Sequence, residues 1–254
     1  MSSKKIGIFK LVNINECNMI ISVIIPTYNE EKNIENCLKA LQKQTLPRDK
    51  YEIIVVDGNS KDRTVKIAKK YTDKVIQQIS EGIGGARNDG VKIAKSELIA
   101  TTDADTIVPS FWLKRIIHDF SKRKKIVMVY GPMWPIEKKI KYKISLNLIN
   151  AINFFLYKLG IFYATIGNNT SFRKKEFILL GGYSNLLAGD DYDLSMKFRR
   201  IGKLYYDRGI SVKTSLRRSE KFGIIYPLYN WWVNFLAGKL SFKPKINYIK
   251  QTYN

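Results

Sequence analysis

Apolar, β-branched runs alternate with helical patterns over the first half of this 254-residue chain, and this alternation constrains the fold more than any other feature. The runs predict strands at residues 20–25, 51–56, 75–79 and 98–102. Because such continuous apolar runs are typical of strands buried on both faces, they favour a parallel sheet with helices on either side. Their alternation with helices of about 10–15 residues predicts βαβ units and an α/β fold.

Local patterns position the predicted helices between these strands. Apolar residues at helical spacing predict a helix over residues 30–43, with Asn29 as its N-cap and Cys37 on its buried face. A second helix is expected to begin near Asp62, and the glycine-rich segment Gly82–Gly85 is expected to form a turn before a third helix. Chains of this pattern bind ligands at the carboxyl ends of their strands.

Charge is distributed unevenly along the chain. The net charge is +22, of which residues 1–119 contribute +4 and residues 120–254 contribute +18. A basic half of this kind predicts an anionic partner, such as a phospholipid surface, a phosphorylated acceptor or a nucleic acid. His118 is the single histidine, and Cys17 and Cys37 lack metal-ligand spacing, so a zinc site or a Ser-His-Asp triad is poorly supported.

Acidic side chains follow two of the predicted strands. Asp57 ends the second strand, and Asp103 and Asp105 follow the fourth. In extended backbone, residues i and i+2 point to the same side, so Asp103 and Asp105 can share one hard divalent cation, Mg²⁺ or Mn²⁺. Such an ion usually takes its remaining ligands from water and substrate phosphates. The alternative is a solvated turn rich in aspartate, and the pair alone does not decide between the two.

A set of motifs in fixed order resembles the glycosyltransferases of family 2, which have the GT-A fold. The motifs are Pro26-Thr27-Tyr28-Asn29-Glu30, Asp57-Gly58-Asn59-Ser60, Gly85-Ala86-Arg87-Asn88, Asp103-Ala104-Asp105 and Gly189-Asp190-Asp191-Tyr192-Asp193-Leu194. The resemblance covers roughly residues 20–215. It implies a mostly parallel central sheet, an inverting sugar transfer from a UDP- or GDP-linked donor, and Mg²⁺ or Mn²⁺ as cofactor.

The same resemblance implies a role for each matching residue. Contacts to the nucleotide sugar are implied for Pro26, Thr27, Tyr28, Glu30, Asp57, Asn59, Arg87 and Asp103. Asp105 is implied as the direct metal ligand, together with Asp103. Asp191 is implied as the catalytic base, and Asp190 stands where glutamate is frequent in the family. A base suits the chemistry because the acceptor hydroxyl must lose its proton as it attacks, although acids at a helix start also suit the helix dipole.

The pattern changes beyond residue 130. Segments 144–166 and 222–238 are strongly apolar, but the first has a stripe of asparagines and the second is short and contains Pro227. Both are therefore predicted to be amphipathic helices that close the core or lie in a bilayer interface. The expected organisation is an N-terminal extension at residues 1–18, a GT-A catalytic domain at 19–220, and a basic, aromatic-rich, membrane-associating segment at 221–254.

These observations predict a metal-dependent inverting glycosyltransferase on the cytoplasmic face of the membrane, attached peripherally, with a lipid-linked glycan as acceptor and no nucleic-acid partner. Arg217 and Arg218 are expected to contact a phosphate of donor or acceptor, or else to form a solvated pair. Three alternatives stay open. They are a polyprenyl-phosphate sugar synthase with the lipid phosphate as acceptor, a basic nucleic-acid-binding protein, and a membrane protein without catalysis.

Overall fold

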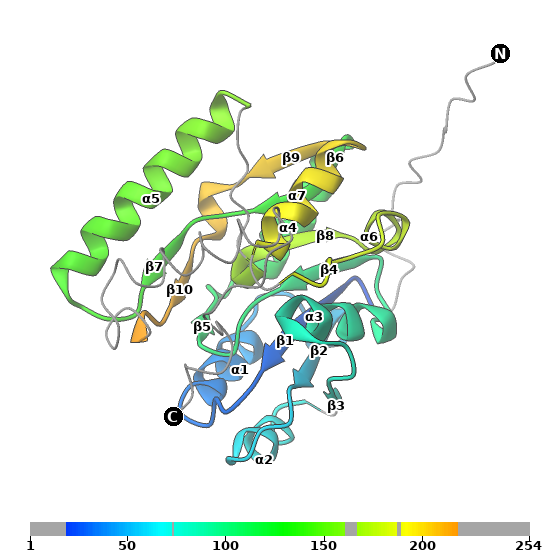
Figure 1. Cartoon of the computed structure of the whole chain (residues 1–254), viewed down its shortest axis with the longest axis vertical. Coiled ribbons are helices and arrows are strands. Elements are labelled where there is room, and N and C mark those ends of the chain that lie inside the picture. Colours follow the sequence, from blue (N-terminus) through cyan, green and yellow to red (C-terminus); the bar gives the residue numbers. More distant parts are fainter. Residues whose placement is uncertain (1–18, 73, 161–166, 187–188, 218–254) are drawn as a thin grey trace.

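The computed structural model describes residues 19–72, 74–160, 167–186 and 189–217, and Figure 1 shows two sheets in this part of the chain. The larger sheet has the strand order β3-β2-β1-β4-β8-β6-β9. Its strands are β1 (Ile21–Thr27), β2 (Tyr51–Asp57), β3 (Lys74–Gln77), β4 (Leu98–Thr101), β6 (Ile126–Tyr130), β8 (Thr170–Arg173) and β9 (Lys203–Tyr206). The smaller sheet has the order β5-β10-β7, with strands β5 (Thr106–Ile107), β7 (Met133–Pro135) and β10 (Val212–Thr214).

The larger sheet is mostly parallel, as the sequence predicts. Strands β3, β2, β1 and β4 run in the same direction. Strand β8 is antiparallel to both of its neighbours, β4 and β6, and β9 is parallel to β6. The predicted α/β class is therefore confirmed, with one reversed strand in the second half of the sheet.

Helices cover both faces of this sheet (Figure 1). The helices of the described residues are α1 (Ile34–Gln42), α2 (Thr64–Ala68), α3 (Gly82–Ile93), α4 (Trp112–Lys122), α5 (Ile140–Lys158), α6 (Lys174–Leu179) and α7 (Asp190–Arg199). Helices α1, α2 and α4 contribute to the apolar cluster on one face, and α3, α6 and α7 to the cluster on the other. Helix α5 lies to the side of these layers, against β7.

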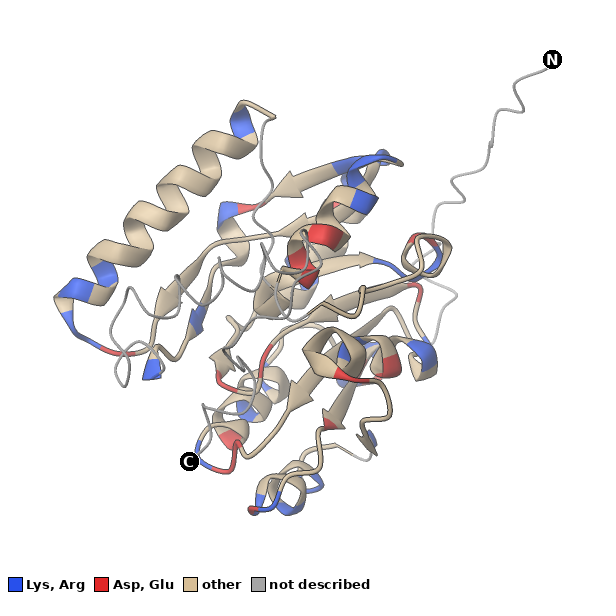
Figure 2. Cartoon of the chain, in the orientation of Figure 1, with Lys and Arg blue, Asp and Glu red and all other residues tan. Residues whose placement is uncertain are grey.

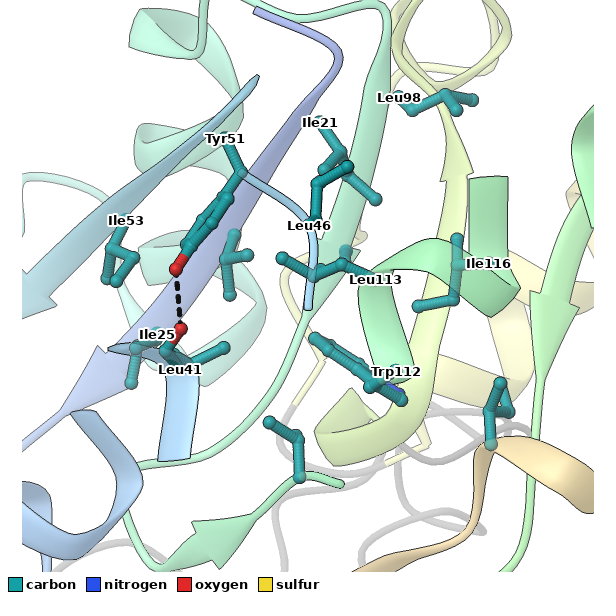
Figure 3. Close-up of a cluster of buried hydrophobic side chains, with 14 of the residues drawn as sticks. Ile21, Ile25, Leu41, Leu46, Tyr51, Ile53, Leu98, Trp112, Leu113 and Ile116 are labelled. Carbon is teal, nitrogen blue, oxygen red and sulfur yellow. Dashed lines mark hydrogen bonds between the residues drawn. The ribbon is translucent and has the colours of Figure 1, made fainter. Parts of the chain in front are cut away.

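The strand β1 illustrates burial on both faces. Ile25 belongs to the cluster under α1 and α4, whereas Ile24 belongs to the cluster on the opposite face. Figure 3 shows the first cluster, where the Trp112 ring lies among aliphatic side chains and the Tyr51 hydroxyl donates a hydrogen bond to the Leu41 carbonyl (2.7 Å). Each large apolar side chain buried in this way stabilises the fold by about 1.5–3 kcal/mol.

Two predictions about loops next to helices are wrong. Helix α1 begins at Ile34 after a further turn, so Asn29 is not its N-cap; Asn29 has left-handed backbone (φ 51°) and its side chain accepts from the backbone N–H of Lys61 (2.8 Å). The glycines after β3 belong to α3 itself, and positive φ (75°) is confined to Gly82. A Cβ on Gly85 would lie 2.8 Å from a backbone carbonyl, so this glycine permits close packing.

Several predictions concern segments that the structure leaves out. Residues 1–18, 161–166 and 218–254, which include the predicted helix at 222–238, lie outside the described residues, and the proposed domain boundaries stay predictions. The apolar segment predicted from residue 144 is helical, but its helix, α5, begins earlier, at Ile140. Within the described ranges, none of the helices combines the length and the apolar character that crossing a membrane requires.

Candidate active site

The carboxyl ends of β1, β2 and β4 lie side by side at one edge of the larger sheet. The register pairs Thr27 of β1 with Asp57 of β2. Just beyond β4, the backbone N–H of Thr102 donates to the carbonyl of Ile24 in β1 (3.2 Å). Because these strands are parallel, the loops that follow them leave the sheet together. The residues expected to contact a nucleotide sugar are thus gathered at one edge.

Asp57 organises the loop that follows β2. Its buried carboxylate accepts hydrogen bonds from the backbone N–H groups of Asn59 (3.0 Å) and Ser60 (2.9 Å) and from the Ser60 hydroxyl (2.5 Å). Asn59 is exposed and has left-handed backbone with a φ of 73°. Three donors on one carboxylate fix the shape of this loop and hold Asn59 at its surface.

The segment after β1 packs against the same loop. Pro26 and Thr27 are buried and Tyr28 is half-buried. The buried Thr27 hydroxyl has no hydrogen-bond partner among the described residues. Glu30 is also buried, and its backbone N–H donates to the Thr64 hydroxyl (2.7 Å). The backbone of the first motif is therefore fixed by hydrogen bonds to the loop after β2 and to the start of α2.

Arg87 of α3 lies at the centre of the second part of the site. Its side chain is 2% exposed, and its guanidinium lies 2.9 Å from the Asp103 carboxylate, 3.5 Å from Asp191 and 3.8 Å from Asp190. Asp103 follows β4, whereas the other two acids begin α7. The backbone N–H of Gly167 also donates to Asp191 (2.9 Å). Segments that are distant in the sequence therefore meet around one buried cation.

Burial changes the acidity of the two aspartates that begin α7. It raises the pKa of Asp191 to about 7, against the positive charge of Arg87 and with the help of the neighbouring negative Asp190. Burial also raises the pKa of Asp190, again against Arg87. The Asp191 side chain keeps 24% of its surface exposed. This carboxylate is thus a stronger base than an ordinary aspartate and is still reachable from solvent.

A second arginine lies at the edge of the site. Arg217, at the end of the described residues, forms a bidentate ion pair with Glu30, in which one N···O distance is 2.6 Å. The same guanidinium lies 3.8 Å from the Asp105 carboxylate. Arg217 therefore joins the loop after β1 to the aspartates after β4, while Arg218 lies outside the described residues.

Comparison with known proteins gives the family. The family model for glycosyl transferase family 2 matches residues 22–177. The chain belongs to this family. The predicted enzyme class, a glycosyltransferase of family 2, is therefore confirmed.

Relatives of this glycosyltransferase come from archaea and bacteria. It is 37% identical over 107 residues to glycosyltransferase AglE of Haloferax volcanii, which covers 40% of this chain and 35% of that protein. It is 40% identical over 122 residues to the poly(ribitol-phosphate) beta-glucosyltransferase of Bacillus spizizenii, covering 45% of this chain and 19% of the relative. The chain thus spans about a third or less of the length of these two relatives.

One relative is similar over a longer stretch. It is the dolichyl N-acetyl-alpha-D-glucosaminyl phosphate 3-beta-D-2,3-diacetamido-2,3-dideoxy-beta-D-glucuronosyltransferase of Methanococcus voltae. The identity is 27% over 236 residues, which cover 80% of this chain and 71% of the relative.

Solved glycosyltransferase structures share the fold. The mannosyltransferase PcManGT from Pyrobaculum calidifontis, in complex with GDP-Man and Mn²⁺, superimposes with a TM-score of 0.68 at 19% identity, over 88% of this chain and 65% of the other. S. aureus TarS 1-349, in complex with UDP-GlcNAc, gives a TM-score of 0.62 at 22% identity, over 78% and 58%. These likenesses confirm the GT-A architecture of the glycosyltransferase.

The aspartates after β4 differ from the predicted geometry in one respect. They do not continue an extended strand, because Asp103 begins a turn in which the backbone N–H of Thr106 donates to its carbonyl (3.0 Å). Asp103 contacts Arg87 and Asp105 lies near Arg217. No cluster of three or more His, Cys, Asp and Glu side chains suited to a metal occurs among the residues the structure describes. The two carboxylates offer oxygen ligands of the kind that Mg²⁺ and Mn²⁺ prefer, and in this structure each of them lies beside an arginine.

Two glycines lie against the charged residues of the site, a contact that the sequence did not predict for either of them. A Cβ on Gly167 would lie 2.2 Å from the Arg87 guanidinium, and a Cβ on Gly84 would lie 2.8 Å from the Asp190 carboxylate. Both glycines therefore let backbone approach the buried charges. Gly84 directly precedes the motif Gly85-Ala86-Arg87-Asn88, so its place near the site could have been predicted. Nothing in the sequence around Gly167 indicates that it contacts Arg87.

Proposed function

We propose that this family 2 glycosyltransferase is a metal-dependent inverting enzyme. It moves a sugar from a nucleotide-diphosphate donor to a hydroxyl of a lipid-linked glycan. The observation that carries the proposal is the cluster in which Arg87 holds Asp103, on the donor side, within ion-pair distance of Asp190 and Asp191. Donor binding and proton removal must occur at adjoining positions in such a transfer, and this cluster joins the residues assigned to the two tasks.

The loops after β1 and β2 are the proposed nucleotide site. They bring Pro26, Thr27, Tyr28, Asp57 and Asn59 to one edge of the sheet, with their backbone fixed by hydrogen bonds between the loops. Related folds have been solved with UDP-GlcNAc and with GDP-Man. Both observations support a UDP- or GDP-linked sugar as the donor, without choosing between the two bases.

Asp191 is the proposed catalytic base. Its carboxylate is held by the Gly167 N–H and by Arg87, so it has a fixed position. Its pKa of about 7 suits the removal of a proton from an acceptor hydroxyl at neutral pH. Arg87 acts through these acids as a positioning residue, because its guanidinium is enclosed by carboxylates. Asp190, beside it, keeps the local field negative.

Asp103 and Asp105 are the residues proposed to hold Mg²⁺ or Mn²⁺. When bound, the ion would stabilise negative charge on the departing diphosphate. Arg217 supports the same task, since its guanidinium already lies beside Glu30 and Asp105 and is suited to bidentate contacts with a phosphate. Structures of related fold contain GDP-Man with Mn²⁺, or UDP with Mg²⁺.

The proposed acceptor is a lipid-linked glycan at the cytoplasmic face of a membrane. It is supported by the charge of +18 on residues 120–254 and by the relative whose name specifies a dolichyl phosphate sugar. The base at Asp191 favours an acceptor hydroxyl over a lipid phosphate, because a phosphate oxygen is already ionised and needs no base.

Donor binding is tested by thermal unfolding with UDP- and GDP-linked sugars, with and without Mn²⁺. A donor present at 100 times its dissociation constant stabilises the fold by about 2.7 kcal/mol. We expect one donor to stabilise the wild-type protein in this way, and we expect the stabilisation to require Mn²⁺. In the Asp105→Asn variant, Mn²⁺ should no longer change the stabilisation by the donor. Absence of stabilisation by every donor, together with absence of donor hydrolysis, would contradict the proposal.

A further inference from the structure

Helix α5 has two apolar faces. The inner face packs on the protein: Tyr142 and Leu146 are buried, and the Tyr157 ring meets Tyr130 edge-on at a centroid distance of 6.3 Å. Asn150, on the same face, is buried and donates a hydrogen bond to the Met133 carbonyl (2.8 Å). One side of the helix is thus anchored to β6 and β7.

The opposite side of α5 is apolar and exposed. Its large side chains recur every three or four residues, which is the spacing of one helix face, and they are between 47% and 71% exposed. They are Ile140, Ile144, Leu148, Ile152, Phe155 and Leu159. A stripe of this span is about 28 Å long at 1.5 Å per residue. Contiguous exposed apolar surface of this kind marks an interaction site more often than a plain solvent-facing surface.

The charges around this apolar stripe are all of one sign on the helix itself. Residues 138–158 contain five lysines, four of them at residues 138–143 and one at Lys158, and no acidic residue. Figure 2 shows basic residues at both ends of α5 and none that is acidic along it. Two further arginines lie nearby: Arg208 is 5.3 Å from the Phe154 ring of α5, and Arg199 donates to the carbonyl of Gly160, two residues after the helix ends (2.8 Å).

We infer that the outer face of α5 docks on a membrane surface that carries anionic lipid headgroups. The argument is charge complementarity combined with the apolar stripe. Lysines at both ends can meet phosphates while the residues between them enter the boundary of headgroups and acyl chains, as an interfacial helix does. This inference rests on the proposed function, which places the protein at a membrane, and it adds which surface of the protein contacts that membrane.

The site of transfer is compatible with such docking. Helix α5 packs on β7, and the third residue of β7 pairs in register with Thr214 of β10. The chain continues from β10 to Arg217, which contacts Glu30 in the candidate active site. The proposed membrane surface and the donor site are therefore linked through the smaller sheet, so an acceptor held at the membrane would need to reach only across this sheet.

The test uses the full chain, vesicles and a matched control. The variant Ile144→Gln/Leu148→Gln/Phe155→Gln removes apolar surface from the stripe. The control Ile178→Gln/Leu179→Gln removes it from α6, where the two side chains are 61% and 74% exposed. Co-sedimentation is measured with phosphatidylcholine vesicles with and without phosphatidylglycerol, at low and high salt. Circular dichroism and donor-induced thermal shifts check folding and the donor site of each protein.

We expect the wild type and the control to bind vesicles that contain phosphatidylglycerol and to be released by salt. The triple variant should bind about 100-fold more weakly, since three apolar side chains each lose part of their burial energy. Leu148→Gln alone should show a smaller loss of the same kind, which guards against misfolding of the triple variant. Donor-induced stabilisation should be the same in all proteins.

Three outcomes overturn the inference. One is a triple variant that binds anionic vesicles as the wild type does, which would move the membrane surface away from α5. Another is a variant whose altered property is its oligomeric state, because a second copy of the chain would then cover the stripe. The third is a wild type that does not bind the vesicles; the membrane part of the proposed function then fails too, whereas donor binding is judged by its own thermal shift.

Discussion

The two halves of the candidate active site use their acidic residues in opposite ways. On the donor side, the Asp57 carboxylate accepts three hydrogen bonds from its own loop. On the other side, Asp190 and Asp191 are packed beside each other and share Arg87 with Asp103. Hydrogen bonds fix the position of the Asp57 carboxylate, whereas on the other side burial raises the pKa of Asp191. In the proposed function, the loops after β1 and β2 hold the donor in a fixed geometry, and α7 carries the proposed catalytic base.

The largest effect on activity should come from the loss of the proposed base, Asp191, which lies in the half of the site formed by α7. Replacing Asp191 by Asn removes the base and keeps the shape of the side chain. We expect kcat to fall by about 10²–10⁴-fold, with donor binding unchanged. Single-turnover transfer and donor-induced thermal shifts measure the two quantities separately.

The control for this variant lies on the same helix. Asp193 pairs with Lys197 (3.0 Å) and accepts from the Ser184 hydroxyl (2.6 Å), away from Arg87. Asp193→Asn should keep most of the activity. If Asp191→Asn retained substantial turnover, the acceptor would be a group that needs no base, such as a lipid phosphate.

The next effect compares an arginine from each half. Arg87→Met leaves three carboxylates around a buried position without their cation, and loss of one partner from a buried ion pair costs about 3–5 kcal/mol. Arg63→Met breaks the pair with Glu31 (3.1 Å) on the donor side, where the arginine side chain is 76% exposed. Exposed pairs contribute about 0–1 kcal/mol.

Urea unfolding of the two arginine variants measures this difference. We expect the free energy of unfolding to drop by several times more in Arg87→Met than in Arg63→Met. Equal losses in the two variants would mean that the carboxylates around Arg87 do not depend on it, and the contrast between the halves would disappear.

The sequence predicted the sheet and its helices better than it predicted the contacts between side chains. Continuous apolar strands and helical spacing were enough for the parallel sheet, because burial on both faces leaves a direct trace in the residue pattern. The strand ends were enough to predict that Asp57, Asp103 and Asp105 lie at one edge of the sheet, whereas Asp191 was assigned to the site by the resemblance to the family. The identity of the acids and their approximate position therefore came from local sequence.

The remaining features depend on contacts between distant residues. Asparagine is a favoured N-cap residue, but Asn29 has left-handed backbone and its side chain accepts a hydrogen bond from Lys61 in the loop after β2. Asp103 lies beside Arg87 and Asp105 lies beside Arg217, and these arginines come from α3 and from the last described residues. The demand for glycine at Gly167 arises from the Arg87 guanidinium. None of these interactions has a signal in the local pattern, since each depends on which segment packs alongside.

A smaller effect is expected when the hydrogen bonds that Asp57 accepts from its loop are weakened. Asp57→Asn keeps the size of the side chain but places an amide N–H₂ where the loop offers N–H and O–H donors. We expect the free energy of unfolding to fall by about 1–3 kcal/mol, the usual cost of an unsatisfied buried polar group. The affinity for the donor should fall as well, while kcat at saturating donor stays near the wild-type value.

Urea unfolding and donor titration distinguish this result from a direct role in the chemistry. Ser60→Ala, which removes only the hydroxyl donor to Asp57, should give a smaller loss of stability in the same direction. A large fall in kcat for Asp57→Asn, with normal stability, would show that the donor side does more than hold the donor in a fixed geometry.

The smallest expected effect is the pH dependence of the transfer. Asp191 must be ionised to accept a proton, and its pKa is about 7. The kcat should therefore reach a plateau above neutral pH and fall about tenfold for each unit of pH below it. Stability should change in the opposite sense, because a raised pKa stabilises the folded state at low pH and this stabilisation is lost as the pH rises through 7. The Asp193→Asn variant should keep the same profile. A kcat that is flat across neutral pH would show that burial beside Asp190 does not raise the pKa of Asp191, and would contradict its role as the base.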